Sequence, residues 1–170
     1  MRFPKRRPAS FGEWSFGLNP GSKELNTILD AQPFNLLPHL AALAIAYALA
    51  FPIGWNREKE ERSAGLRTFP LVAVATCGVV QAAEAMTGES AEAMARIIEG
   101  LITGMGFIGG GAILRKEDSV SGTATAASLW ITGAIGIAVG LGSYDVAMML
   151  TVATGVTLWL LPPLKRLTKN

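Results

Sequence analysis

Long apolar segments separated by short charged ones run through most of this chain. A helix needs about 20 predominantly apolar residues to cross the hydrocarbon core of a bilayer. Five segments approach that length: residues 36–55, 68–86, 97–114, 123–140 and 146–163. Because backbone groups in lipid must be hydrogen-bonded within the segment, each is expected to be helical. The pattern predicts an all-α polytopic membrane protein, a bundle of about five transmembrane helices. A re-entrant pair formed by the last two segments is the alternative.

Composition agrees with a membrane protein and argues against several other classes. Only 16% of the residues are charged, against about 25% in soluble domains. The single Cys77 excludes an intrachain disulfide and a cysteine-based zinc site, and His39 is the lone histidine. We therefore expect no enzyme activity and no cofactor, while metal binding stays open. A net charge of +2 gives no strong attraction to nucleic acid, so no such partner is expected.

The distribution of Lys and Arg predicts the orientation in the membrane, because cytoplasmic loops carry an excess of both. Among the Lys and Arg residues, Arg96 alone lies in the loops on the opposite side. An odd number of spans then places the C-terminus in the cytoplasm and the N-terminus outside. The cations that follow the first, third and fifth segments are Arg57, Lys59, Arg62, Arg67, Arg115, Lys116, Lys165, Arg166 and Lys169.

The same pattern divides the chain into three parts. Residues 1–33 are polar and rich in Gly and Pro, and we expect a mobile N-terminal tail. Residues 34–164 form the predicted transmembrane domain, and residues 165–170 a cytoplasmic tail. Pro162 and Pro163 are expected to end the last span, since proline cannot continue a helix.

The third segment contains six glycines between Gly100 and Gly111. Gly104, Gly106 and Gly109 fit the spacing of a dinucleotide-binding loop, but such a loop needs a preceding strand and a water-accessible turn. In lipid, small residues allow helices to approach closely, so this segment is expected to be a crowded central helix. Local unwinding that exposes backbone to an ion is the alternative. Under either interpretation, Gly106→Leu is expected to disrupt packing or assembly.

Two charges lie near the start of this glycine-rich segment. Glu99 is one turn into it, and Arg96 is three residues earlier on the same helix face. Acidic residues inside membranes are rare and commonly functional, whereas a glutamate near a helix N-terminus also complements the helix dipole. The sequence leaves two interpretations, a capping ion pair between Arg96 and Glu99 or a contact for an ion or proton.

Three ordered motifs together resemble the MgtC/SapB family of bacterial inner-membrane proteins. The first consists of Arg57 and Glu58 followed by Ala64, Gly65, Leu66, Arg67 and Thr68. The second is Arg96 and Ile97 followed by Gly104, Gly106, Phe107, Gly109, Gly111 and Arg115. The third begins at Gly122 and contains Thr125, Ala126, Ala127, Ser128 and Trp130. The resemblance covers residues 36–160.

The resemblance implies a multi-pass protein of the bacterial inner (plasma) membrane with five spans. Family members are associated with adaptation to low magnesium and with virulence, and some are thought to restrain the F-type ATP synthase through contacts in the membrane. The chain departs from the family pattern at Ala93, where an Asp is common, and at Gly100, where a Gln is common. It stops at Asn170, where some members continue into a cytoplasmic domain, so it resembles a short form.

Two hypotheses of function follow. The first is a non-enzymatic protein that acts through helix–helix contacts with the lipid-embedded parts of partners, with the ATP synthase and a homo-oligomer as candidates. The alternative is a transporter or channel for Mg²⁺ or another cation, suggested by Glu99 and by a glycine-rich helix that can unwind.

Overall fold

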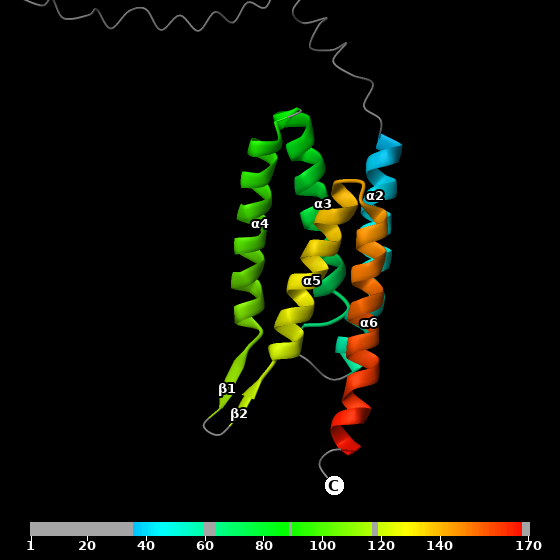
Figure 1. Ribbon diagram of the computed structural model, residues 1–170, viewed down its shortest axis with the longest axis vertical. Coiled ribbons are helices and arrows are strands. Elements are labelled where there is room, and N and C mark those ends of the chain that lie inside the picture. Colours follow the sequence, from blue (N-terminus) through cyan, green and yellow to red (C-terminus); the bar gives the residue numbers. More distant parts are fainter. Residues whose placement is uncertain (1–35, 60–63, 89, 117–118, 168–170) are drawn as a thin grey trace, which may run out of the picture. The chain divides into compact units, whose positions relative to one another are not determined.

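The computed structural model describes residues 36–59, 64–88, 90–116 and 119–167 (Figure 1). The chain divides into two units, residues 1–35 and 36–170. The predicted tail of residues 1–33 lies outside the described residues. The second unit contains five helices: α2 (Leu36–Lys59), α3 (Thr68–Thr87), α4 (Ala91–Gly111), α5 (Thr123–Gly140) and α6 (Tyr144–Leu167). The all-α class is therefore confirmed.

Three of the described helices, α2, α3 and α5, are long and apolar enough to cross a membrane, and the apolar part of α6 is shorter. Helix α4 does not belong to this set, because it begins at Ala91 and so includes Glu92, Arg96 and Glu99. Its glycines also contribute little apolar surface. Candidate membrane spans are therefore confirmed at α2, α3 and α5, and spans at α4 and α6 stay predictions.

The helices alternate in direction along the chain (Figure 1). Because α2, α4 and α6 run one way and α3 and α5 the other, the three cation-rich segments gather at one end of this unit. This arrangement agrees with the charge-based orientation, although the side that faces the cytoplasm stays a prediction. Helices α5 and α6 are two separate helices of 18 and 24 residues, joined by a tight turn in which Gly142 has φ 73°. The re-entrant alternative stays a prediction.

The centre of the bundle is α5, not the glycine-rich α4. Helix α5 packs against α2, α3, α4 and α6, and 56% of its apolar window is buried, compared with 22% for α2. Helix α4 buries only Met105 and Gly109. The expectation of a crowded central helix at residues 97–114 was therefore wrong, because its neighbours cover one narrow face of it.

Small residues explain why α5 takes the central position. A Cβ atom at Gly136 would collide with the Thr76 hydroxyl and the Ala73 carbonyl of α3, and one at Gly140 would lie 2.8 Å from Val80 Cβ. The backbones of α5 and α3 thus lie in direct contact, which is how helices associate in lipid. The hydroxyl of Thr76 adds a hydrogen bond to the Gly133 carbonyl at 3.1 Å.

A short hairpin connects α4 to α5, which the all-helical prediction lacks. Strands β1 (Leu114–Lys116) and β2 (Ser119–Ser121) pair antiparallel, with Arg115 opposite Val120. Helix α4 consequently ends at Gly111 instead of residue 114. At Gly122, which precedes α5, φ is 88° and a Cβ atom would collide with the Ala112 carbonyl. Only glycine fits this position, since it alone combines positive φ with so close an approach.

Helix α6 continues past Pro162 and Pro163 to Leu167, so the expectation that the proline pair ends the helix was wrong. Proline removes backbone N–H donors, but its fixed φ of about −65° is itself helical.

Gly136→Ala should destabilise the bundle, because the added methyl group would push α5 away from the Thr76 hydroxyl and the Ala73 carbonyl. Overpacking of this kind costs about 1–3 kcal/mol, and thermal unfolding of the purified protein in detergent measures it. Gly155→Ala on α6 is the matched control, since its Cβ would meet nothing within 4 Å. Equal melting temperatures for the two variants would contradict the proposed α3–α5 contact.

Candidate functional site: the groove between α3 and α4

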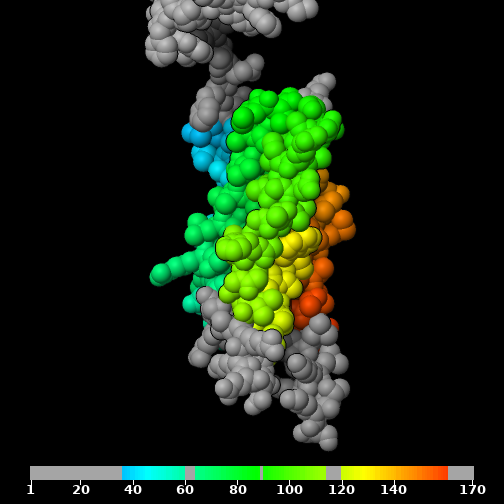
Figure 2. Space-filling view, turned by 90° about the vertical axis from the view of Figure 1, so that its left-hand side faces the viewer, coloured from blue at the N-terminus to red at the C-terminus, as the bar shows by residue number. Residues whose placement is uncertain are grey.

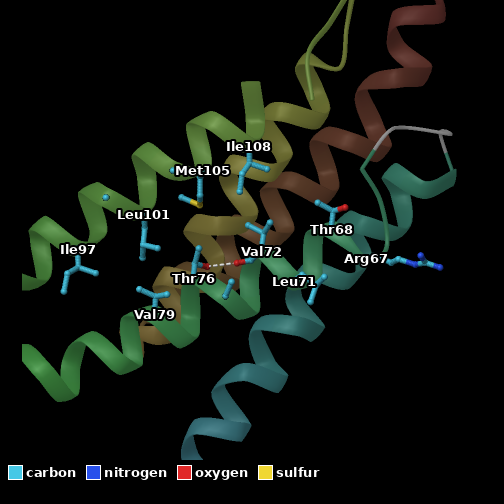
Figure 3. A pocket seen from close by; sticks show the side chains of 13 residues that line it. Arg67, Thr68, Leu71, Val72, Thr76, Val79, Ile97, Leu101, Met105 and Ile108 are labelled. Atoms are coloured by element: carbon cyan, nitrogen blue, oxygen red, sulfur yellow. Dashed lines mark hydrogen bonds between the residues drawn. The ribbon is translucent and has the colours of Figure 1, made fainter. Parts of the chain in front are cut away.

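An open groove of about 690 Å³ runs between α3 and α4 (Figure 3). Both helices contribute residues spaced three or four apart, so each presents one continuous face to it. The lining residues are Arg67, Thr68, Leu71, Val72, Ala75, Thr76 and Val79 from the α3 side and Ile97, Gly100, Leu101, Gly104, Met105 and Ile108 from α4.

The groove is apolar at its walls and lacks side chains on part of its α4 surface. Leu71 and Ile108 are exposed along its sides. At Gly100 and Gly104, an added Cβ atom would meet nothing within 4 Å. The α4 backbone is therefore open here to close approach by another group. Figure 2 shows α4 lying along the face turned to the viewer, uncovered by the other described helices.

The polar groups of the groove are few. Thr76 is buried, and its hydroxyl lies within hydrogen-bond distance of the carbonyls of Val72 (3.0 Å), Ala73 (3.1 Å) and Gly133 (3.1 Å). Arg67 and Thr68 lie at one end, where Arg67 extends away from the helices (Figure 3). None of the thirteen lining residues is a carboxylate. The groove thus matches an apolar ligand with a hydrogen-bonding or anionic group at one end.

The ion pair at the start of α4 differs from the one expected. Arg96 Nη2 lies 2.8 Å from Glu92 Oε1, so the first of the two interpretations, a capping pair of Arg96 with Glu99, was wrong. A glutamate four residues before a basic residue is the favoured helical arrangement, and Ser90 Oγ already caps the helix by accepting from Ala93 N–H at 3.3 Å. Both partners are more than three-quarters exposed, so the pair contributes little stability.

Glu99 is exposed and lies outside the groove. Its backbone carbonyl accepts a hydrogen bond from the Thr103 hydroxyl at 2.8 Å. Within the part of the chain that the structure describes, no group of three or more His, Cys, Asp and Glu side chains could hold a metal ion. An ion or proton contact at Glu99 stays a prediction.

The first motif connects the end of α2 to the start of α3 through a contact that we call the structural lock, between the Glu58 side chain and the backbone of Gly65 and Leu66. A carboxylate oxygen of Glu58 accepts a hydrogen bond from the Leu66 N–H at 3.1 Å, and Gly65 is so close to this carboxylate that a Cβ atom would collide with it. The Gly65 carbonyl accepts in turn from the N–H groups of Thr68 and Phe69, at 3.0 and 3.2 Å. The chain therefore enters α3 in a fixed position.

Arg57, next to this lock, is only 2% exposed. Its guanidinium donates to Asn56 Oδ1 from Nη2 at 2.6 Å and from Nε at 3.2 Å. A buried guanidinium needs such partners, because an unpaired buried charge is costly. Arg57 and Glu58, which are adjacent in the motif, thus each stabilise the fold at the end of α2 through separate contacts.

The second motif is divided between two faces of α4. Gly104 lines the groove, whereas Gly106, Phe107 and Gly111 are exposed on its outer surface and Phe107 is 87% exposed. Gly109 alone packs closely, with a Cβ position 3.3 Å from the Ala126 carbonyl. Arg115 lies in β1. The division shows that most of these glycines are not needed to pack this chain.

Gly106→Leu is therefore not expected to disturb packing within the chain, contrary to the expectation from sequence. An added Cβ atom at Gly106 would meet nothing within 4 Å. An effect of this substitution on assembly stays a prediction.

The third motif packs α5 into the bundle. Thr125 and Ser128 are 1% and 3% exposed, and the Ser128 hydroxyl donates to the Ala124 carbonyl of its own helix at 2.6 Å. The Ala126 backbone contacts Gly109, while Ala127 and Trp130 are exposed. This motif positions α5 against α4, and so indirectly fixes one wall of the groove.

Some residues that shape the site were missed from the sequence. Met105 fills the space left by Gly133, where a Cβ atom would collide with its side chain. Thr76 makes the hydrogen bond from α3 to α5. A lone threonine within the apolar run of residues 69–80 was the available signal, because a hydroxyl in lipid needs an acceptor.

Glu58→Ala and Gly65→Ala should each lower the free energy of unfolding by about 1 kcal/mol, the usual net value of one hydrogen bond. The effects should not add in the double variant, because both remove the same contact between the Glu58 carboxylate and the Leu66 N–H. Thermal unfolding in detergent of the single and double variants measures this cycle. Fully additive losses would show that the two residues act independently.

The amino-acid sequence of this chain is similar to those of known proteins. The sequence model of the MgtC family matches residues 43–167. Protein SrpB of Synechococcus elongatus is 35% identical over 128 residues, covering 68% of this chain and 70% of that protein. Protein MgtC of Salmonella typhimurium is 38% identical over 117 residues, covering 69% of this chain and 49% of that protein.

Protein MgtC of Brucella abortus is likewise 38% identical over 117 residues, which cover 68% of this chain and 48% of the relative. The chain thus spans about half the length of these two MgtC proteins. No solved structure matches it significantly.

Proposed function

The chain belongs to the MgtC family of membrane proteins, and on that premise we propose that it is a non-enzymatic protein that acts by binding a transmembrane helix of a partner protein in the α3–α4 groove. The observation that carries the proposal is the open glycine surface of α4. Gly100 and Gly104 line the groove, and a Cβ atom at either position would meet nothing within 4 Å among the residues that the structure describes.

The interior of the bundle supports this interpretation of the glycine surface. There, Gly136 and Gly140 bring the α5 backbone against α3, because close van der Waals contact replaces the hydrophobic effect in lipid. Gly100 and Gly104 have the same four-residue spacing, yet among the described residues their Cβ positions would meet nothing within 4 Å, since the groove separates them from α3. They have the features of a helix interface whose second half comes from another protein.

The groove also indicates the chemistry of the partner. Its apolar walls fit an apolar helix, and glycines at the contact fit one with small residues on the facing side. Arg67 at one end of the groove would favour an acidic or carbonyl group on the partner near the cytoplasmic membrane surface. A partner helix of this kind would cross the membrane beside α3 and α4.

The family resemblance supplies the biological setting of the proposal. We place the protein in the bacterial inner membrane, in adaptation to low magnesium or to virulence-related stress. The membrane sector of the F-type ATP synthase and a second copy of this chain are candidate partners. Transport of Mg²⁺ or another cation, the alternative function, has no comparable support, since the residues lining the groove include no carboxylate.

Photo-crosslinking in native membranes tests the groove. A photoreactive phenylalanine analogue at Leu71, exposed at the edge of the groove, should capture a partner, whereas one at Met149, equally exposed on α6, should not. Adding Gly104→Leu to the Leu71 variant should remove most of the adduct, because leucine would fill the glycine surface. Gly106→Leu, on the same helix but outside the groove, is the matched control and should leave the adduct intact.

Two results would count against the proposal. Equal adducts from Leu71 and Met149, or an adduct that survives Gly104→Leu, would show that the groove does not hold the partner. Mg²⁺ entry into proteoliposomes faster than into empty liposomes would favour the transport alternative instead.

A further inference from the structure

A second open hollow of about 570 Å³ lies between the C-terminal halves of α2 and α6. It is lined by the rings of Phe51, Trp55 and Trp159, together with Pro52, Asn56 and Lys59. Lys59 is the last residue of α2, so the hollow lies at the cation-rich end of the bundle. The α3–α4 groove does not share any of these residues.

A ladder of side chains on α2 leads into this hollow. Tyr47, Phe51, Trp55 and Lys59 are spaced by four and share one helix face. The ring centroids of Tyr47 and Phe51 are 6.3 Å apart and those of Phe51 and Trp55 are 6.0 Å apart. The Lys59 ammonium lies 5.2 Å from the centre of the Trp55 ring. All four side chains are exposed, so the ladder faces away from the protein core.

This order of groups matches the profile of a membrane surface. Tryptophan rings favour the headgroup level of a bilayer, and a lysine near a helix end extends its ammonium towards the phosphates. The cation–π contact holds the Lys59 ammonium beside Trp55, while its remaining N–H donors stay available. None of the six lining residues is acidic, and the nearby Glu58 carboxylate accepts from Leu66 N–H.

We propose that this hollow is a binding site for an anionic phospholipid. The lipid phosphate accepts hydrogen bonds from Lys59, its glycerol region lies between Trp55 and Trp159, and an acyl chain follows Phe51 and Tyr47 along α2. Preference for a net negative headgroup follows from the positive charge of Lys59, the one cation among the residues that line the hollow. The proposal rests on the membrane placement and is independent of any partner in the α3–α4 groove.

Native mass spectrometry of the purified full chain in detergent tests the site. Phosphatidylglycerol should bind in preference to phosphatidylcholine with identical acyl chains. Lys59→Gln should reduce that preference about fivefold, because the positive charge that favours a net anionic headgroup over a zwitterionic one is lost, and Lys59→Arg should restore it. Arg67→Gln is the matched control, since it removes one cation from the same end but outside the hollow.

A second measurement covers the case in which a variant folds poorly. The test uses chains that keep Lys59 and only one tryptophan. Phosphatidylglycerol brominated near its ester should quench the fluorescence of Trp55 more strongly than that of Trp130, which is exposed on α5 and does not line the hollow. Equal quenching would overturn the proposal. Equal binding of the two lipids, or equal effects of Lys59→Gln and Arg67→Gln on binding, would also overturn it. A protein dimer that depends on Lys59, observed instead of lipid adducts, would overturn it as well.

Because this test uses purified protein and lipid alone, its outcome is separate from that of the proposed function. If the protein selects the anionic lipid but no partner is captured in the groove, only the proposed function fails. If a partner is captured but the lipids bind equally, only the lipid site fails.

Discussion

The direct contact between the backbones of α5 and α3 is the interaction on which the rest of the bundle depends. In lipid, helices gain little from burying apolar surface, so they must approach closely to associate. Gly136 and Gly140 allow this approach, and Thr76 adds a hydrogen bond across it. With α5 fixed on α3, α2 and α6 pack on one side. Helix α4 packs on the other side, and an open groove remains between it and α3.

The residues of the three motifs that carry the family resemblance therefore have different roles. Glu58 and Gly65 lock the entry into α3, and Gly122 permits a turn that no other residue fits. These positions are explained by the fold of the single chain. The position of Gly104 is not explained in this way, because a Cβ atom there would meet nothing within 4 Å among the described residues. Gly106 is equally open, but of these two only Gly104 also lines the α3–α4 groove, and the proposed partner is placed in the groove for this reason.

The sequence predicted the helices well and their packing poorly. Apolar runs of spanning length located all five helices, since length and composition are local properties. The pairs Gly100–Gly104 and Gly136–Gly140 have the same spacing, however, and only the tertiary structure shows that the second is buried and the first is open. On a helix, Arg96 could pair with either Glu92 or Glu99. Because α4 begins at Ala91, Glu92 lies on the same helix one turn before Arg96, and these two residues form the ion pair. The groove combines two helices, so no single segment could reveal it.

Oxygen accessibility of spin labels on α4 tests the central claim most directly. Labels would be placed at residue 104 or 105 of a Cys77→Ala chain, with one purified copy in each lipid nanodisc. A label at Gly104 is expected to be readily accessible to oxygen, while one at Met105, which is 4% exposed and packed against α5, is expected to be protected. Equal protection at the two positions would show that the glycine surface of α4 is buried within the chain, and would contradict the account.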